Sequence, residues 1–138
     1  IDLALYLFKS FDIKYAFMDK SKTLDIEVED KAYLLGQNNY GTTITIRLNF
    51  CTNIERRSLL IRGSHGEILW NINKGELSLS VKEDQKKYDK FKTTKDDIFE
   101  LQLSKFFDSQ FNTSNNLCTV QEGISVLKII ERSFKIKE

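Results

Sequence analysis

One hairpin pattern constrains the fold of this chain more than any other feature. Residues 57–62 and 67–72 are two apolar-rich segments joined by the short turn Gly63-Ser64-His65-Gly66. A tight, glycine-flanked turn between two strand-like segments is typical of an antiparallel β-hairpin. We therefore expect the chain to build its core around antiparallel strands.

Strand-like segments also lie on both sides of this hairpin. In residues 42–50 Thr and Ile alternate, which predicts a half-buried strand, and the preceding turn 38–41 ends in Gly41, a residue that accepts a positive φ. Residues 25–30 alternate as well but are acidic, so they form either a short edge strand or an extended lead-in. The other expected strands are 12–18, 31–36, 77–81 and 88–92.

Helical patterns stand at the two ends of the chain. Residues 1–9 have apolar side chains on most sides, which predicts the end of a well-buried helix. Capping signals at 94–97 and 119–122 predict two further helices near the C-terminus. The apolar face expected for the last helix consists of Ile124, Leu127, Ile130 and Phe134, widened by Val126 and Ile129.

The order of these elements predicts an α+β fold in a single domain, residues 1–138. We expect one mostly antiparallel, open-faced sheet of about six to seven strands, with the helices packed on one face. The open face mixes polar and apolar residues, so it is either solvated or a surface for a partner. Its expected members are Thr43, Thr45, Arg47, Ser58, Leu60, Arg62, Leu69 and Asn71.

Composition excludes several classes of function. Lys and Arg number 21 against 20 Asp and Glu, so no basic excess is present to drive nucleic-acid binding. No apolar run reaches the roughly 18 residues that a membrane span needs. The two cysteines, Cys51 and Cys118, lie far apart in a chain with a single histidine, which argues against a metal site. We expect two reduced, buried thiols in a cytoplasmic protein.

Few residues suggest chemistry of their own. His65, the single histidine, lies in a tight turn and is expected to be exposed rather than catalytic, so no catalytic residue is assigned. The turn at 63–66 has strands on both sides, whereas a phosphate-binding loop leads into a helix. Arg56 and Arg57 offer planar donors suited to a phosphate or carboxylate, and they are the expected substrate-binding or interface residues.

Three blocks in order resemble the C-terminal domain of the glucose–fructose oxidoreductase / inositol dehydrogenase (Gfo/Idh/MocA) family. The opening helix 1–8 is similar to the helix that follows that family's active-site histidine, with Asp2 at the position of a family Asp. Residues 57–71 resemble its strand, Gly-x-x-Gly turn and Ile-x-Trp-Asn strand, and 97–107 with 119–134 resemble its two closing helices. The resemblance extends over essentially the whole chain.

The resemblance implies an NAD(P)-dependent oxidoreductase that acts on a sugar, cyclitol or nucleotide-sugar. An N-terminal Rossmann domain would hold NAD or NADP, while this domain would line the substrate pocket and form a homo-oligomer through its open sheet face. The chain has no Gly-x-Gly-x-x-Gly, Glu-Lys-Pro or Asp-x-x-x-His segment, and it starts in mid-pattern. We therefore expect a non-catalytic fragment without a cofactor, from a protein whose Rossmann domain is absent here.

Two other functions remain open. The chain could be a free-standing α+β module that binds a small ligand or pairs with itself, which would require a gene that starts near Ile1. It could also bind single-stranded nucleic acid by stacking bases on the sheet, which a net charge of +1 makes the weaker alternative. The paired arginines favour a nucleotide-sugar or surface-polysaccharide pathway within the enzyme hypothesis.

Overall fold

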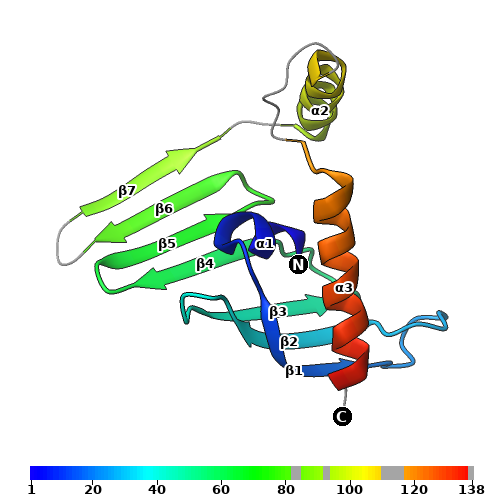
Figure 1. The fold of residues 1–138 in the computed structure, drawn as a ribbon. Coiled ribbons are helices and arrows are strands. Elements are labelled where there is room, and N and C mark those ends of the chain that lie inside the picture. The colour runs from blue at the N-terminus through cyan, green and yellow to red at the C-terminus, as the bar shows by residue number, and fades with distance from the viewer. Residues whose placement is uncertain (82–84, 92–93, 110–116, 137–138) are drawn as a thin grey trace. The chain divides into compact units, whose positions relative to one another are not determined.

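A computed structural model describes residues 1–81, 85–91, 94–109 and 117–136 (Figure 1). Seven strands and three helices lie in these residues, and the order of helix, strands and two helices confirms the predicted α+β class. The helices are α1 (Asp2–Phe8), α2 (Lys95–Ser109) and α3 (Val120–Ile136). The strands are β1 (Asp12–Asp19), β2 (Lys31–Gln37), β3 (Thr43–Asn49), β4 (Ser58–Gly63), β5 (Gly66–Asn71), β6 (Glu76–Val81) and β7 (Gln85–Lys90).

Every strand pairing is antiparallel, as expected, but the strands form two sheets rather than one. One sheet has the order β1-β2-β3 and the other the order β4-β5-β6-β7. Short turns join β2 to β3, β4 to β5 and β5 to β6, and a longer loop, residues 20–30, joins the paired strands β1 and β2. Residues 50–57 connect β3 to β4, which do not pair. The chain accordingly divides into unit 1 (Ile1–Thr52 with Cys118–Glu138) and unit 2 (Asn53–Leu117).

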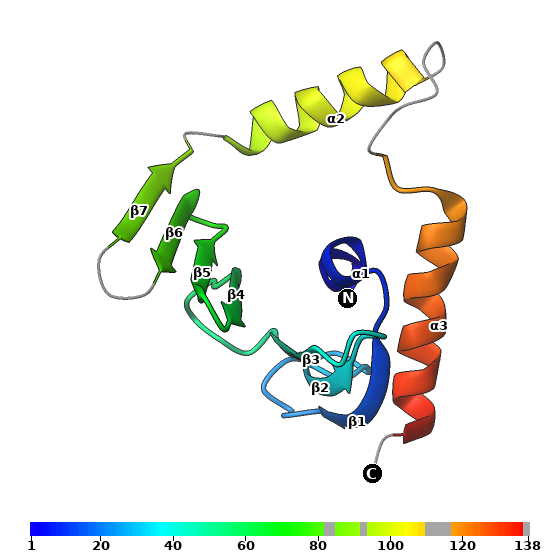
Figure 2. The same cartoon turned by 60° about the vertical axis from the view of Figure 1, so that its left-hand side comes forward.

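Unit 1 holds the hydrophobic core. Its fully buried apolar residues come from one face of the three-stranded sheet and from the residue just before β1, and α3 lies along β1 on this side (Figures 1 and 2). Half-buried side chains of α1 and α3 pack against the same cluster, which confirms that these two helices cover one face. The buried apolar residues are Phe11, Ile13, Ala16, Met18, Leu34 and Ile44.

A β-bulge in β1 changes which side chains face this core. The register with β2 shifts between Ile13, which pairs with Gly36, and Tyr15, which pairs with Leu35. Lys14 is therefore an extra residue, and a bulge of this kind reverses the alternation beyond it. Because of the bulge, Ile13 and Ala16 both face the core although they are three residues apart. In a regular strand, residues three apart point to opposite faces.

The face of α3 that packs on β1 is only partly the predicted one: Ile129 packs against the core as expected, but other members of the expected stripe are exposed. Ser133 is buried, whereas Leu127 and Phe134 of the expected stripe are 64% and 50% exposed. The small Ser133 lets the helix approach the sheet, and its hydroxyl donates to the carbonyl of Ile129 at 2.8 Å, so no polar group is left unsatisfied. Arg132, one residue earlier, reaches Asp12 of β1 at 2.6 Å.

Both predicted capping signals are present. In α3 the Glu122 N–H donates to the Thr119 hydroxyl at 3.2 Å, and the Thr119 N–H donates to the Glu122 carboxylate at 2.7 Å. Thr94 and Asp97 exchange the equivalent bonds at the start of α2, at 3.1 and 2.7 Å. Local sequence therefore sets where both helices begin.

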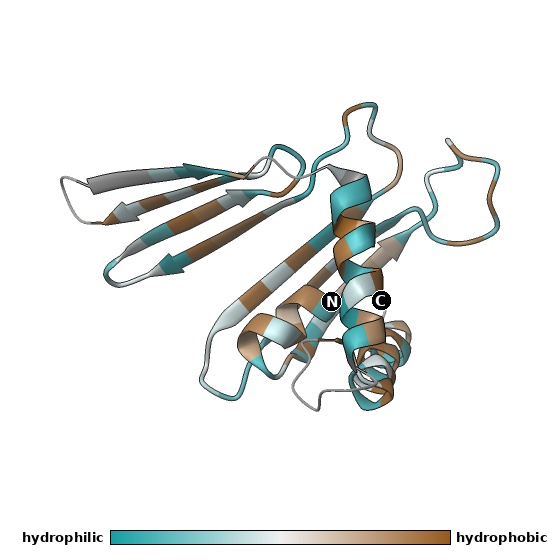
Figure 3. Cartoon of the chain, turned by 90° about the horizontal axis from the view of Figure 1, so that it is seen from above, coloured by the Kyte–Doolittle hydropathy of each residue, from teal (hydrophilic) through white to brown (hydrophobic). Residues whose placement is uncertain are grey.

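Unit 2 has strands but no core of its own. Apolar residues follow one another in the middle of β4 (residues 59–61) and β5 (residues 68–70), whereas apolar and polar residues alternate along β6; Figure 3 shows bands of hydrophobic residues in these strands. The apolar face is only half-buried, and no described side chain of this unit is fully buried. Its members are Leu59, Ile61, Ile68, Trp70, Leu77 and Leu79.

Several smaller expectations were wrong. Residues 25–30 form an irregular loop, so the edge strand, one of the two alternatives, is wrong there, and no residue of α1 is fully buried. Of the two thiols expected to be buried, Cys118 is exposed and Cys51 is only partly buried. In α1 and at Cys118 apolar character predicted burial, but the structure leaves these residues partly or fully exposed.

Candidate functional site

The structure places both predicted substrate-binding arginines on the surface. Arg56 and Arg57 lie at the end of the connection that leads into β4, and both are exposed. The Arg57 carbonyl accepts the Ile72 N–H at 2.8 Å, which fixes the backbone beside β5. Neither guanidinium forms a hydrogen bond or ion pair within the described part of the chain, so both remain available to a ligand.

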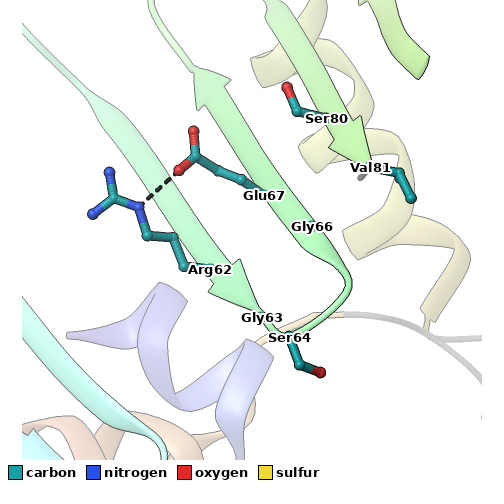
Figure 4. Close-up of a pocket in the computed structure, with 7 residues that line it drawn as sticks. All are labelled: Arg62, Gly63, Ser64, Gly66, Glu67, Ser80 and Val81. Atoms are coloured by element: carbon teal, nitrogen blue, oxygen red, sulfur yellow. Dashed lines mark hydrogen bonds and ion pairs between the residues drawn. The ribbon is translucent and has the colours of Figure 1, made fainter. Parts of the chain in front are cut away.

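A shallow depression lies at the β4–β5 turn, as Figure 4 shows. Its volume is about 440 Å³, and it is open to solvent rather than enclosed. Gly63 and Gly66 have no side chains to fill the depression. Arg62 and Glu67 form an ion pair of 2.7 Å at the side of the depression. The lining residues are Arg62, Gly63, Ser64, Gly66, Glu67, Ser80 and Val81.

This depression offers contacts but no catalytic group. Its arginine is already paired with Glu67, and His65 in the same turn is exposed, as the sequence predicted. The Ser64 hydroxyl lies 2.9 Å from Nδ1 of His65, a contact across adjacent surface residues. An exposed histidine without a buried orienting carboxylate lacks the arrangement of a general base.

The most elaborate polar cluster in the described residues surrounds Asp30, which the sequence reasoning missed. Asp30 is 1% exposed, and its carboxylate accepts the N–H of Ser21 at 3.1 Å as well as the Ser21 hydroxyl. That hydroxyl lies 3.0 Å from Sγ of Cys51. Asp30 lies directly before β2, at the end of a long loop. This position in the sequence could have indicated that its carboxylate holds the loop in place. The cluster ties the β1–β2 loop to the end of β3.

These hydrogen bonds predict sensitivity to acid. Ser21 above all holds the pKa of the Asp30 carboxyl below its ordinary value, against the opposing effect of burial. The Asp30 carboxylate therefore takes up a proton more readily in the unfolded chain, where its pKa is about 4, than in the folded chain. The contribution of Asp30 to the free energy of unfolding is fully present above that unfolded pKa, and it is lost as the pH falls through the lower pKa of the folded state. We expect the urea midpoint of the wild type to fall more steeply below pH 4 than that of Asp30→Asn.

At neutral pH Asp30→Asn should also be less stable than the wild type, because an amide replaces one acceptor oxygen with a donor. Asp25→Asn, an exposed carboxylate in the same loop, is the matched control and should leave the midpoint nearly unchanged. Equal acid profiles for wild type and Asp30→Asn would show that Asp30 does not contribute to the pH dependence.

The open face of the unit 1 sheet carries aromatic side chains. Phe17, Tyr33 and Arg47 lie side by side in register across β1, β2 and β3. The rings of Phe17 and Tyr33 are 6.2 Å apart, and the Arg47 guanidinium lies 5.3 Å from the centre of the Tyr33 ring. Tyr15 and Leu35, in the next row, are 42% and 40% exposed. An exposed apolar patch of this kind often marks an interaction surface.

The sequence identified only part of this face. Thr45 and Arg47 were expected there and are exposed on it, but the aromatic residues of β1 were not, because the bulge at Lys14 hides their direction. The strand register, which pairs Arg47 with Tyr33 and Tyr33 with Phe17, shows that the aromatic side chains of β1 lie on this face. Leu60 and Leu69, also expected on an open face, are exposed on the separate sheet of unit 2.

Two kinds of site are absent from the described residues. No group of three or more His, Cys, Asp or Glu side chains is arranged to hold a metal ion there. None of the described helices is long and apolar enough to cross a membrane. Cys51 and Cys118 are free thiols.

Comparison with known proteins gives matches in structure alone. No family model and no curated protein sequence matches the chain. UDP-N-acetylglucosamine 3-dehydrogenase GnnA from Acidithiobacillus ferrooxidans matches 98% of this chain with a TM-score of 0.77 and 16% identity. The chain shares its fold with part of this dehydrogenase, a Gfo/Idh/MocA-type oxidoreductase.

Two further solved structures agree with this fold. An inositol dehydrogenase homologue from Azotobacter vinelandii, complexed with NADH and myo-inositol, matches 67% of this chain with a TM-score of 0.54 and 14% identity. An oxidoreductase from Pseudomonas syringae matches 64% of this chain with a TM-score of 0.53 and 16% identity. The resemblance seen in the sequence is thereby confirmed at the level of fold.

The chain corresponds to only part of each of these Gfo/Idh/MocA-type proteins. It spans 42% of the length of GnnA and 26% of the length of each of the other two. The match shows a shared fold, and the greater part of each of these enzymes lies outside it.

Proposed function

We propose that this chain is the C-terminal substrate-binding and pairing domain of an NAD(P)-dependent oxidoreductase that acts on a sugar, cyclitol or nucleotide-sugar. The observation that carries this proposal is the match of 98% of the chain to 42% of a UDP-N-acetylglucosamine 3-dehydrogenase. The cyclitol and NADH present in a second matching structure support the same substrate and cofactor classes. The cofactor would bind to the part of the protein that lies outside this chain.

Within this proposal the 138-residue chain is not catalytic by itself, and its role is to hold substrate and to pair subunits. The free thiols Cys51 and Cys118 support a reducing, cytoplasmic location. The coding frame upstream of Ile1 tests the assignment. A continuous frame with a strand-linked Gly-x-Gly-x-x-Gly supports it, whereas a start codon at Ile1 favours the free-standing binding module.

Arg56 and Arg57 are the proposed substrate contacts, because both guanidinium groups are exposed and unpaired within the described residues. A hydrogen bond to a charged group contributes about 1.5–3 kcal/mol, which corresponds to about tenfold or more in affinity. We expect Arg57→Ala and Arg56→Ala in the full-length protein to raise KM by about that factor while kcat changes little. Lys20→Ala, which removes an exposed cation on another loop, is the control and should leave KM unchanged. If KM is the same in all variants and the wild type, Arg56 and Arg57 do not contact the substrate.

Pairing is proposed to use the open face of the unit 1 sheet. Phe17 is 40% exposed at the β1 end of the aromatic row, so a carboxylate there would be desolvated in a pair at a cost of several kcal/mol. We expect Phe17→Glu to shift the protein from dimer to monomer in sedimentation velocity. Tyr40→Glu, on a turn where the side chain is 86% exposed, is the control and should stay dimeric. A wild type that is strictly monomeric at high concentration would contradict this interface.

A further inference from the structure

The depression at the β4–β5 turn is bordered by polar side chains from three neighbouring strands. Arg62 of β4 pairs with Glu67 of β5, and Glu67 pairs with Ser80 of β6. Residues that pair directly in an antiparallel sheet point to the same face, so these three side chains form one row. All three line the depression, as Figure 4 shows. The spacing of its polar groups is therefore set by strand pairing rather than by a loop.

The ion pair between Arg62 and Glu67 leaves part of each group available. It joins Nε of Arg62 to one carboxylate oxygen of Glu67 at 2.7 Å. The terminal guanidinium nitrogens and the second carboxylate oxygen have no further partner within the described residues, and neither has the Ser80 hydroxyl. The two charged side chains are 73% and 41% exposed, so a ligand can reach them. The depression thus offers hydrogen-bond donors and acceptors side by side.

The charges of this row favour a neutral ligand over an anion. The Glu67 carboxylate lies against the Arg62 guanidinium and offsets the positive charge that would attract a phosphate. A polyhydroxylated molecule fits better, because each hydroxyl both donates and accepts a hydrogen bond. One hydroxyl can donate to the free oxygen of Glu67 while its neighbour accepts from Arg62. Hydrogen bonds to charged groups of this kind are stronger than those between neutral groups.

The next row on the same sheet face supplies an apolar contact. Leu60 and Leu69 pair with each other, and each lies two residues along its strand from Arg62 or Glu67. The two leucines are 44% and 43% exposed. A sugar or cyclitol ring has C–H groups between its hydroxyls, and these can pack against aliphatic side chains. A small number of polar groups beside apolar surface is the usual composition of a small-molecule site.

We propose that this depression binds a neutral polyhydroxylated ring, with adjacent hydroxyls on Glu67 and Arg62 and the C–H groups of the ring against the two leucines. The choice of a sugar or cyclitol rests on the proposed function. The site itself is an addition to that function, because it lies at the other end of β4 from the two arginines proposed above as substrate contacts.

Heteronuclear NMR of the nitrogen-labelled 138-residue chain tests this site. The amide signals of Gly63 and Gly66 are followed while myo-inositol, methyl glucoside, cyclohexanol or pyrophosphate is added. Because the site is open and makes few contacts, we expect saturable shifts with either polyol at concentrations on the order of millimolar. Cyclohexanol, with a single hydroxyl, and the anion pyrophosphate should cause none. Absence of saturable shifts with both polyols, or equal shifts with cyclohexanol or pyrophosphate, would overturn the proposal.

Two variants give a matched comparison. Glu67→Gln keeps the size of the side chain but removes the charged acceptor, so we expect polyol binding to weaken about tenfold. Lys90→Gln breaks a similar exposed ion pair, with Glu76 at 3.4 Å, at the other end of the paired strands, and should leave binding unchanged. If the two variants bind the polyol equally well, Glu67 does not contact the ligand and the proposal is wrong.

A dehydrogenase assay separates this site from the proposed function. Reduction of a dinucleotide by the protein encoded by the complete reading frame, without polyol-induced shifts at Gly63 and Gly66, would overturn only the assignment of this depression. Saturable shifts at both glycines without any such reduction would contradict the oxidoreductase assignment and leave the polyol site in place.

Discussion

Ile13→Ala should lower the free energy of unfolding by about 2–5 kcal/mol, the largest stability effect expected in this chain. The Ile13 side chain is 1% exposed and lies in the one fully buried apolar cluster found among the described residues. Removing three carbons there leaves a cavity beside β2 and α3 that tight packing cannot close. Urea unfolding followed by far-ultraviolet circular dichroism measures the loss.

Ile54→Ala is the matched control, because Ile54 is 67% exposed in the connection between the units. Its effect should stay within about 0.5 kcal/mol. Similar losses for the two variants would contradict the placement of the core in unit 1. A small loss for Ile13→Ala alone would mean that α1 and α3 do not pack tightly on the sheet.

Gly66→Ala should also be strongly destabilising, by about 1–3 kcal/mol or more, although it adds a single methyl group. A Cβ at Gly66 would collide with the carbonyl oxygen of Ser80 and lie 3.2 Å from the Cα of Val81. These are backbone atoms of the paired strand β6, so relief requires β5 and β6 to separate. The same change should alter the depression at the β4–β5 turn.

Gly63→Ala provides a closely matched comparison in the same turn. A Cβ at Gly63 meets only the Gly66 carbonyl oxygen, at 3.8 Å, and neither glycine has a positive φ. We expect this variant to be as stable as the wild type or slightly more stable, since alanine restricts the unfolded chain. If Gly66→Ala and Gly63→Ala unfold at the same urea concentration, the backbone of β6 does not lie as close to Gly66 as the structure places it.

Local patterns predicted most of the secondary structure. The turn at Gly63–Gly66, the positive φ of Gly41 and the caps at Thr94 and Thr119 all depend on neighbours within a few residues, and each is confirmed. Short turns account for the antiparallel pairing of β2 with β3, β4 with β5 and β5 with β6. Local chemistry of this kind is visible in sequence because the interacting groups are adjacent.

Features that depend on distant contacts could not be predicted. The bulge at Lys14 requires a partner strand, and it decides that Ala16 rather than Tyr15 is buried. Ser133 is buried because α3 approaches β1 there, whereas hydropathy favoured the face with Leu127. The hydrogen bonds from Ser21 to Asp30 join two residues nine positions apart, and no short motif marks this contact.

The candidate site was predicted least well. Arg56 and Arg57 are exposed as expected, but their role as substrate contacts stays a prediction because a ligand position cannot be inferred from two surface cations. The aromatic row of Phe17, Tyr33 and Arg47 required the strand register before it could be recognised. A site made of residues from several strands depends on which residues of neighbouring strands pair. The periodicity of the sequence predicts strands but not the register between them.

Hydride transfer by the protein encoded by the complete reading frame tests the central claim most directly. The protein is incubated with NAD or NADP and, in turn, nucleotide-sugars, free sugars and cyclitols, and the absorbance of the reduced nicotinamide is followed. We predict substrate-dependent reduction with at least one of these classes, and none with the 138-residue chain alone. Absence of reduction with all three classes, in a folded protein that also fails to bind either dinucleotide, would contradict the oxidoreductase assignment.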